Sequence, residues 1–393
     1  MAGIDRGFDY LVPDGAGPIE VGTIVRVPLQ GRRVAGWVEQ LDPAPAPGVH
    51  LRPLLSVSSV GPSPELVALA GWAARRWAGR LAVFLRAASP PVNVRQAPTG
   101  DATPPRTGHA RSVIRLAPAG DWWPVVRSVA GGMGKGQLLL LCPSVAAAAS
   151  VAGRLRRDGQ AVALLPREWP QAAAGASFVV GVRAAAWGPA PLLGAVMVLD
   201  AHDQAFQEER APTWRAWDVA AERARRADAP CVLVSPCPSL EQLHWGELHV
   251  GARQDERAGW APLEVIDRRT EDPRAGWLAA RLVDVIRDPE ATPDRPVVCV
   301  VNRKGRARLL ACGSCGSLAT CERCGAAVGQ PAAGTDTGPP ALACGRCGDT
   351  RPRVCLACGS QRFKNLRPGV TRLREEVEAL ANRPVAEVTG EAG

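Results

Sequence analysis

The chain has 393 residues, of which 46% are hydrophobic, and a net charge of +9 at pH 7. This length predicts two or three domains rather than one. The positive charge, nearly all of it arginine, suits a polyanionic partner such as nucleic acid. The longest apolar runs, such as LLGAVMVL, are too short to cross a bilayer, which excludes a membrane-spanning protein and predicts a soluble one. The cysteine usage described below predicts a reducing, cytoplasmic compartment.

The N-terminal region reads as a small β-rich domain over residues 1–87. Four short apolar runs alternate with turns and predict strands within 8–13, 22–29, 32–41 and 50–57. One apolar helix is expected over 64–88, because Leu66, Leu69, Ala73 and Trp77 recur at helical spacing. Residues 88–111 are rich in Pro, Thr and Gly and are expected to form a linker.

Residues 112–252 alternate apolar strands with helical patterns. The runs QLLLLCP, AVALLP, SFVVGV, GAVMVLD and PCVLVSP predict buried strands, and the segments 144–159 and 213–228 between them predict helices. Consecutive strand–helix–strand units favour a doubly wound parallel sheet, so this region is expected to be an α/β lobe. The fold class is therefore α/β.

A second α/β unit is expected to begin over residues 253–310, with a helix in 277–288 and a strand in 296–305. A cysteine-rich module at 311–360 interrupts it. Residues 361–393 then predict one more helix, so this second lobe is expected to be cut short.

Eight cysteines of this module form four C-x-x-C pairs, each followed by glycine. They are Cys312/Cys315, Cys321/Cys324, Cys344/Cys347 and Cys355/Cys358. Such a pair has the spacing of a zinc knuckle, in which both thiolates bind one metal ion. Four pairs supply ligands for two tetrahedral sites and predict two zinc ions per chain. A disulfide-stapled module is the weaker alternative, because adjacent knuckles are a poor disulfide pattern. The remaining cysteines, Cys142, Cys231, Cys237 and Cys299, lie in or beside apolar runs and are expected to be reduced thiols.

This order of modules resembles the family of the primosomal replication-restart protein N′, or PriA, a superfamily 2 helicase family. FDYLVP followed by GTIVRVPL resembles the family's N-terminal 3′-end DNA-binding domain, and GAVMVLDAHD resembles its Walker B strand. VVNRKGRARLLACGSCG resembles its lead-in to the first knuckle. The resemblance implies superfamily 2 helicase-like parallel-sheet lobes with an inserted two-zinc module. It also implies that the outer pairs (Cys312, Cys315, Cys355, Cys358) share one zinc and the inner pairs (Cys321, Cys324, Cys344, Cys347) the other.

The nucleotide-binding motifs depart from the family's pattern. Where a phosphate-binding loop with its lysine is expected, the chain reads Gly120-Asp121-Trp122-Trp123, and an aspartate with two indoles would repel or block a triphosphate. Lys135 lies in a different glycine-rich segment, GGMGKGQ, which lacks the Ser/Thr and is followed by a predicted strand. Asp200 remains at the Walker B position and retains the capacity to take a metal, but Ala201-His202-Asp203 replaces the family's Glu-Glu-His. The later ATPase motifs would lie beyond residue 393, so the chain is expected not to be an enzyme.

The resemblance also implies a pocket for the 3′ end of DNA. Its matching positions are Phe8, Asp9, Tyr10, Gly31 and Arg52. A carboxylate there would accept a hydrogen bond from a free 3′-hydroxyl, an aromatic ring would stack on the base and a cation would meet phosphate. Basic residues on both sides of the cysteine module, Arg303 and Lys304 among them, predict a further phosphate-contacting surface.

Together these patterns predict a replication restart protein that binds forked DNA with a 3′ end, acts as a monomer and recruits primosome and helicase-loading proteins. It would do so without helicase activity. Two alternatives stay open at this point. One is an active ATP-dependent 3′-to-5′ DNA helicase, and the other is a zinc-ribbon interaction module with a decayed, structural α/β body.

Overall fold

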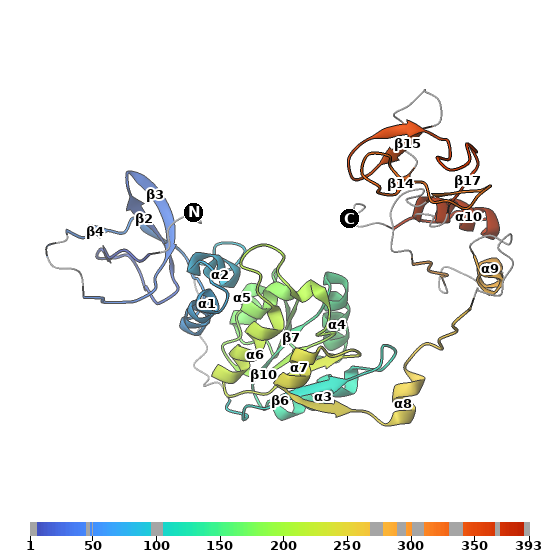
Figure 1. Cartoon of the computed structure of the whole chain (residues 1–393). Helices are drawn as coiled ribbons and strands as arrows, with labels where there is room; N and C mark the ends of the chain where they lie inside the picture. Colours follow the sequence, from blue (N-terminus) through green and yellow to red (C-terminus); the bar gives the residue numbers. More distant parts are fainter. Residues whose placement is uncertain are drawn as a thin grey trace. The chain divides into compact units, whose positions relative to one another are not determined.

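The computed structural model describes residues 6–44, 48, 50–95, 105–267, 278–288, 296–300, 310–329, 341–365 and 370–388. The chain divides into two compact units, Met1–Pro262 and Leu263–Gly393, and each is described by itself (Figure 1). Among the residues just given, no helix has both the length and the apolar character needed to span a membrane.

The first unit begins with a small β domain. Its strands are β1 (Tyr10–Leu11), β2 (Ile24–Leu29), β3 (Arg32–Trp37), β4 (Arg52–Pro53) and β5 (Ser56–Ser59). Strands β3, β2 and β5 form an antiparallel sheet in that order, and β1 pairs with β4 in parallel. Val25, Val27 and Leu54 form its core, because alternate residues of a strand face the same side. All four predicted strand regions are confirmed, the last of them divided into β4 and β5.

Two helices follow where one was expected. Helix α1 (Pro64–Arg76) begins after Ser63, whose hydroxyl accepts a hydrogen bond from the backbone N–H of Leu66, and α2 spans Leu81–Ala88. The prediction of one helix over 64–88 was wrong because Ala78 has a φ of +48°, which ends the first helix. Gly79 follows, and a Cβ at this position would lie 2.7 Å from Cγ of Pro212. The break thus lets the chain pass close to the α/β lobe.

The lobe contains a seven-stranded sheet in the order β12-β6-β11-β10-β7-β9-β8, in which every neighbouring pair is parallel. Its strands are β6 (Arg111–Arg115), β7 (Gln137–Leu141), β8 (Val162–Leu164), β9 (Phe178–Gly181), β10 (Leu193–Val198), β11 (Cys231–Ser235) and β12 (Glu247–Val250). The predicted parallel sheet and its five apolar strands are confirmed. The edge strand β12 was not predicted, because its four residues are all exposed and show no apolar run.

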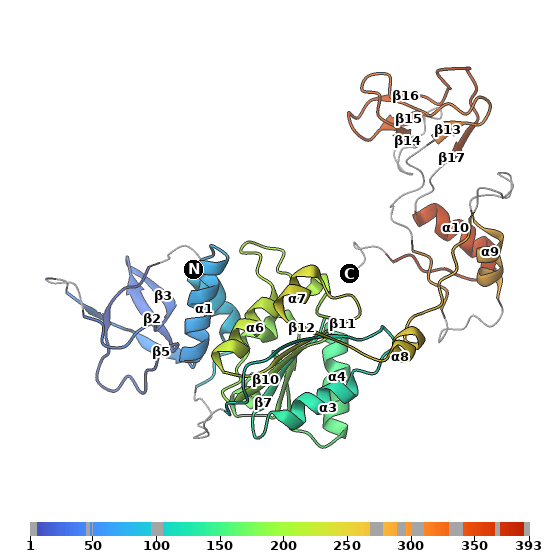
Figure 2. The same cartoon turned by 60° about the horizontal axis from the view of Figure 1, so that its bottom comes forward.

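Helices cover both faces of this sheet (Figure 2). Helices α3 (Trp123–Gly132) and α4 (Val145–Arg157) pack on one face, against Leu138, Leu140 and Met197 among others. Helices α1, α2 and α6 (Ala216–Arg226) share a core with the other face. The remaining short helices of the unit are η1 (Arg183–Trp187), η2 (Gln204–Phe206), α5 (Trp169–Ala173), α7 (Leu240–Trp245) and α8 (Arg253–Ala258).

The β domain is joined to the lobe through α1 and α2. Their apolar residues belong to the same hydrophobic cluster as Trp187, Trp214 and Trp217 of the lobe. Where the sequence predicted a linker, the backbone N–H of Val94 donates to the hydroxyl of Ser59, and the backbone N–H of Val60 donates to the Val94 carbonyl. The described part of that segment is therefore bonded to the end of β5.

The second unit contains α9 (Ala280–Arg287), α10 (Val370–Ala381) and the cysteine module. Leu278 and Ile286 pack with Leu373 and Val377 in a small apolar core. Residues 296–300 form no strand, unlike the prediction for 296–305, and residues 301–305 lie outside the described part of the chain. The module's strands are β13 (Leu310–Cys312), β14 (Val328–Gly329), β15 (Ala341–Cys344), β16 (Thr350–Pro352) and β17 (Phe363–Asn365).

Candidate metal centres and nucleic-acid interface

The four C-x-x-C turns of the second unit share one backbone frame. In each, the N–H of the following glycine donates to the carbonyl of the first cysteine at 2.9–3.0 Å. In each, the N–H of the first cysteine donates at 2.8 Å to the carbonyl five residues further on. The four glycines, Gly316, Gly325, Gly348 and Gly359, have φ between +69° and +77°, a conformation that side-chain-bearing residues rarely adopt. The repeated glycine in the sequence thus reflects a repeated turn.

Pairing of the strands brings these turns together in two sets. Strand β17 pairs with β13 and holds the last turn beside the first, whereas β15 pairs with β14 and β16 around the two inner turns. Within each set of four cysteines, all sulfur atoms lie within 4.8 Å of one another. The sets are Cys312, Cys315, Cys355 and Cys358, and Cys321, Cys324, Cys344 and Cys347. The structure therefore shows the outer-with-outer and inner-with-inner arrangement.

The chemistry of each set fits a metal ion. The sulfur of Cys312 is 3.5 Å from that of Cys358, and the sulfur of Cys324 is 3.5 Å from that of Cys344. The backbone N–H groups of Cys315 and Ser314 lower the pKa of Cys312 to about 6, and those of Cys347 and Arg346 do the same for Cys344. Four soft sulfur donors at these separations could hold one tetrahedral metal ion in each set.

The other four cysteines belong to neither set. Cys142 and Cys231 are buried, Cys237 is exposed and Cys299 is partly buried. Burial, with a smaller contribution from the charge of Asp200, raises the pKa of the Cys142 thiol to about 12. Cys142 and Cys231 are thus free thiols in the core of the lobe, as expected, whereas the exposed Cys237 does not pack in a core.

The positions predicted for a 3′-end pocket lie around the β1–β4 pair. Tyr10 and Arg52 are directly opposite each other in this pair. The Tyr10 hydroxyl donates to the carbonyl of Pro28 at 3.1 Å, and burial raises the pKa of Tyr10 while Arg52 opposes this effect. Gly31 has a φ of +75° and forms the turn between β2 and β3, directly after the strand that carries Pro28.

The two preceding residues extend from this pair into solvent. The Phe8 side chain is 39% exposed, and the guanidinium of Arg6 lies 4.7 Å from the centre of its ring. Asp9 is exposed. An accessible ring, a carboxylate and a cation therefore occur on consecutive or paired residues of one edge of the β domain. Arg303 and Lys304 lie outside the described residues.

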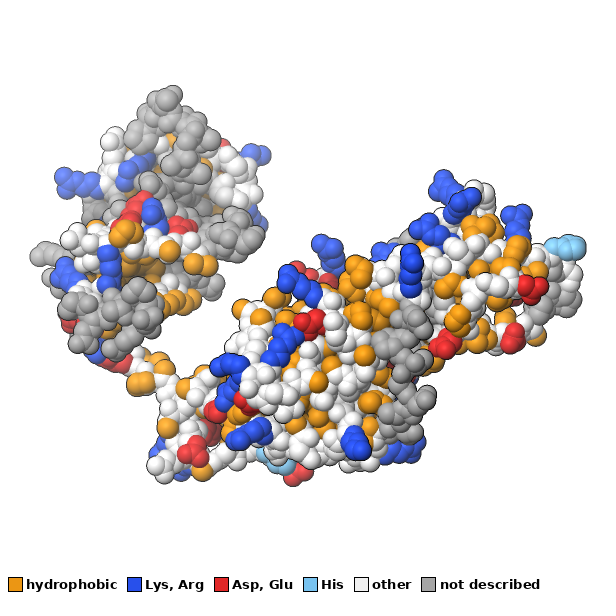
Figure 3. All heavy atoms as spheres, turned by 180° about the vertical axis from the view of Figure 1, so that it is seen from behind, with side chains coloured by type: hydrophobic (Ala, Val, Ile, Leu, Met, Phe, Trp, Pro, Cys, Tyr) orange, Lys and Arg blue, Asp and Glu red, His pale blue; other side chains and the backbone are white. Residues whose placement is uncertain are grey.

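Sequence reasoning missed the basic outer face of the β2–β3 hairpin. Arg26, Arg32 and Arg33 are exposed, and Arg26 lies between the buried Val25 and Val27, on the opposite face of β2. Arginine side chains gather over this domain on the face shown in Figure 3. Residues 6–95 contain ten arginines and six acidic residues, so the domain is cationic. The alternation in TIVRVPL was the signal that could have identified Arg26.

The loop between β6 and α3 occupies the position at which a phosphate-binding loop was expected. Its backbone N–H groups already have partners within the chain. Leu116 donates to the Ser235 carbonyl, Ala119 to that of Gly259 and Gly120 to that of Ala117, at 2.8–3.2 Å. A phosphate-binding loop needs several such groups to be available to its ligand, and these are not.

The start of α3 is occupied by the chain's own carboxylate. Asp121 Oδ1 accepts a hydrogen bond of 3.0 Å from the N–H of Trp123. Arg154 of α4 lies 3.4 Å from the same oxygen, and its guanidinium is 4.3 Å from the centre of the Trp123 ring and 5.4 Å from that of Trp122. Because helix N-termini attract anions, Asp121 takes the place that a phosphate would take.

The Walker B position is exposed at the end of β10. Asp200 has a φ of +50° and lines a cavity of about 280 Å³ together with Gly120 and Trp122. His202 Nδ1 is 3.0 Å from the Ser235 hydroxyl, and Asp203 accepts from the N–H of Ala205 at the start of η2. Both side chains therefore make local structural contacts.

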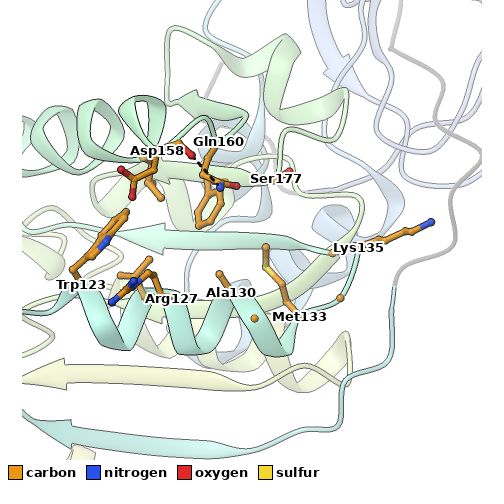
Figure 4. Close-up of a pocket in the computed structure, with 14 residues that line it drawn as sticks. Trp123, Arg127, Ala130, Met133, Lys135, Asp158, Gln160 and Ser177 are labelled. Carbon is orange, nitrogen blue, oxygen red and sulfur yellow. Dashed lines mark hydrogen bonds between the residues drawn. The ribbon is translucent and has the colours of Figure 1, made fainter.

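A second, larger cavity of about 630 Å³ lies between α3, the end of α4 and the first residues of β7 and β9. Trp123, Arg127 and Asp158 line it (Figure 4). Lys135 is at its rim, and Figure 4 shows its side chain extending away from the cavity. As predicted, a strand begins two residues after Lys135, so this lysine does not precede a helix as a phosphate-binding lysine would.

Comparison with known proteins shows that the N-terminal domain resembles a known DNA-binding domain. Residues 1–90 match the family model described as the 3′DNA-binding domain (3′BD) of PriA. A probable replication restart protein PriA from Mycobacterium tuberculosis is 28% identical over 95% of this chain and 65% of its own length. The replication restart protein PriA of Synechocystis is 27% identical over 68% of this chain and 34% of its own length. The Pyrococcus furiosus Hef helicase domain aligns over 38% of this chain and 36% of its own, with 17% identity and a TM-score of 0.29.

The matches and the geometry define an α/β protein with an N-terminal 3′BD-type β domain and a double four-cysteine module. Over up to 95% of its length the chain is similar to replication restart proteins PriA, and its residues 1–90 match their 3′DNA-binding domain. It spans between about a third and two thirds of the length of the relatives named above.

Proposed function

We propose that this chain is a DNA-binding protein of replication restart, which recognises the 3′ end of a strand at a fork and does not hydrolyse ATP. In this proposal it acts as a monomer in the cytoplasm and recruits primosome and helicase-loading proteins. The observation that carries the proposal is a contrast within one unit. The β domain that matches the 3′BD model exposes its aromatic, acidic and basic side chains, whereas the loop at the start of α3 is filled by the chain itself.

The assignment of DNA rests on the β domain. Phe8 is accessible for stacking on a base, and Arg52, opposite Tyr10, is an exposed cation for a phosphate. Asp9 offers the acceptor that a terminal hydroxyl requires. The exposed arginines of β2 and β3 would add contacts that do not depend on sequence, since phosphate contacts position a protein on DNA without reading bases.

The assignment against ATP hydrolysis rests on the β6–α3 loop. Phosphoryl transfer depends on charge stabilisation by backbone amides, a lysine and a metal ion. Here the amides have internal partners, Asp121 brings a negative charge, and Lys135 belongs to another loop. Each of these features removes one contribution to catalysis.

We further propose that each four-cysteine set binds one zinc ion. Zinc takes four thiolates in structural sites of this kind, and such a site stabilises a module whose own apolar core is small. When bound, the two ions would hold the four turns in their nested arrangement, and the cysteines named above would be their ligands.

The test is a fluorescence-anisotropy titration of the whole chain with forked DNA, without nucleotide. Tight binding that is weakened when the 3′ end is blocked, and unchanged by ATP, is the result that we expect. Unwinding of the fork that requires ATP would instead identify a helicase. No binding to any DNA would leave the zinc-ribbon interaction module as the better description.

A further inference from the structure

The common frame of the four C-x-x-C turns makes their third residues equivalent. These residues are Ser314, Arg323, Arg346 and Ala357. All four are exposed, and each directly precedes the second cysteine of its turn. Ser314 and Ala357 therefore border the outer cysteine set, whereas Arg323 and Arg346 border the inner one. The two cysteine sets thus have identical ligands but differ in the exposed third residues of their turns, which we call the rim of each set.

The outer rim is small and neutral. The Ser314 hydroxyl is 2.9 Å from that of Ser360, which belongs to the opposite turn of the same set. This contact shows that a third residue is directed across its set toward the facing turn. By the equivalence of the turns, the corresponding positions of the inner set are both occupied by long, cationic side chains.

Within the described part of the chain, the two inner arginines have no structural partner that would explain them. Neither Arg323 nor Arg346 makes an ion pair or a side-chain hydrogen bond with any residue that the structure describes. Arg351 of the same module behaves differently. It donates to the carbonyls of Thr320 at 3.2 Å and Val354 at 2.6 Å and so ties the inner set to the last turn. Arg351 thus has a structural role in the module, whereas Arg323 and Arg346 face solvent.

Charge balance alone does not account for this difference. A divalent metal ion with four thiolates carries a net charge of about −2, and nearby cations would stabilise it. This holds equally for both sets, yet only the inner set has arginines at the equivalent positions. A role directed outward explains the asymmetry better, because exposed arginines bind phosphate oxygens with strong, charge-assisted hydrogen bonds.

We propose that the turns at Cys321–Cys324 and Cys344–Cys347 form a phosphodiester-binding rim, in which Arg323 and Arg346 each contact one phosphate of bound DNA. This inference rests on the proposed function, namely that the chain binds DNA. It adds a second contact region, on the metal-binding module, to the one in the β domain. Single-stranded and duplex arms of a fork share the phosphodiester chemistry, so the test must distinguish them.

The test is the salt dependence of DNA binding by the full chain. Binding of single-stranded and of duplex DNA is measured by anisotropy over a range of salt concentrations for the wild type and for Arg323→Gln/Arg346→Gln. Loss of two phosphate contacts reduces the slope of log K against log salt by about 1.4 on a single strand, or about 1.8 on a duplex. The DNA on which the slope changes identifies the arm that is bound.

Two further variants guard the interpretation. Arg323→Lys/Arg346→Lys retains both charges and should keep the wild-type slope, and Ser314→Ala changes the equivalent position of the outer set without altering charge. Metal analysis of each variant shows whether the module has remained folded. Unchanged slopes on both DNAs, with the metal content retained, would overturn the inference while leaving DNA binding intact. A wild type that binds neither DNA would overturn the proposed function as well.

Discussion

The guanidinium of Arg223 in α6 reaches Glu65 at the start of α1, with 3.2 Å between Nε and Oε1. The arginine side chain is only 1% exposed. It also donates to the carbonyls of Ala186 and Gly188 at 3.3 and 2.6 Å. One buried cation thus connects the helices that follow the β domain with two segments of the α/β lobe.

We expect Arg223→Ala to destabilise the first unit strongly. The substitution leaves two buried carbonyls without their donor and creates a cavity, which together should cost roughly 3–5 kcal/mol. Arg225→Ala is the control, since the Arg225 side chain is 60% exposed and its i,i+3 pair with Glu222 is worth less than about 1 kcal/mol. Urea denaturation followed by circular dichroism measures both. Equal midpoints for the two variants would show that the buried contact is not important for stability.

The connection between β domain and lobe could not be predicted from the sequence. Arg223 lies in the run AAERARR, where each arginine has the same local pattern, and its burial depends on α1 packing against α6. The strands of the lobe were predictable because a parallel strand buried on both faces is a continuous apolar run. The break in the helix over 64–88 was not, since the left-handed Ala78 is stabilised by neighbouring segments rather than by its own propensity.

The glycine at this break provides a second prediction. We expect Gly79→Ala to cost about 1–3 kcal/mol, because its Cβ would lie within 2.9 Å of Pro212 and Phe84 in a packed region. Gly153→Ala, in the interior of α4 with nothing within 4 Å of the new methyl group, should instead stabilise the protein by about 0.5–1 kcal/mol. Opposite shifts in thermal denaturation are the expected result. A neutral Gly79→Ala would mean that the close approach relaxes easily.

For the metal centres, we expect two zinc ions in the dialysed wild-type protein and one in either Cys312→Ser or Cys344→Ser, because the two sets share no ligand. Cys237→Ser removes an exposed thiol outside both sets and should keep two ions. Elemental analysis by mass spectrometry counts the metal. Disulfide-linked pairs without metal would contradict this assignment.

The four cysteine turns that form the two sets could be predicted from the sequence, because C-x-x-C followed by glycine is a local signal. Which turns pair was not fixed by spacing alone and came from the family resemblance. The positions predicted for the 3′-end pocket, in contrast, carry no local signal. Tyr10 and Arg52 are far apart in sequence, and only the parallel pairing of two very short strands brings them together.

For nucleotide hydrolysis, we expect no DNA-stimulated phosphate release by the wild type, because Asp121 occupies the start of α3 and the loop amides are bonded internally. Lys135→Ala should leave this result unchanged, since the Lys135 side chain extends away from the cavity beside α3. A colorimetric phosphate assay is sufficient. Phosphate release that disappears in Asp200→Asn would show that the activity belongs to this chain and would contradict the proposal.

The central claim is that the β domain reads a free 3′ end, and Asp9 tests it most directly. Binding of a fork with a free 3′-hydroxyl is compared with binding of the same fork carrying a 3′-phosphate, for the wild type, Asp9→Ala and Arg52→Ala. The wild type should lose about tenfold or more in affinity for the blocked end, since one charge-assisted hydrogen bond contributes roughly 1.5–3 kcal/mol. Asp9→Ala should bind both forks alike, whereas Arg52→Ala should weaken both and keep the difference. Equal binding of free and blocked ends by the wild type would contradict the account.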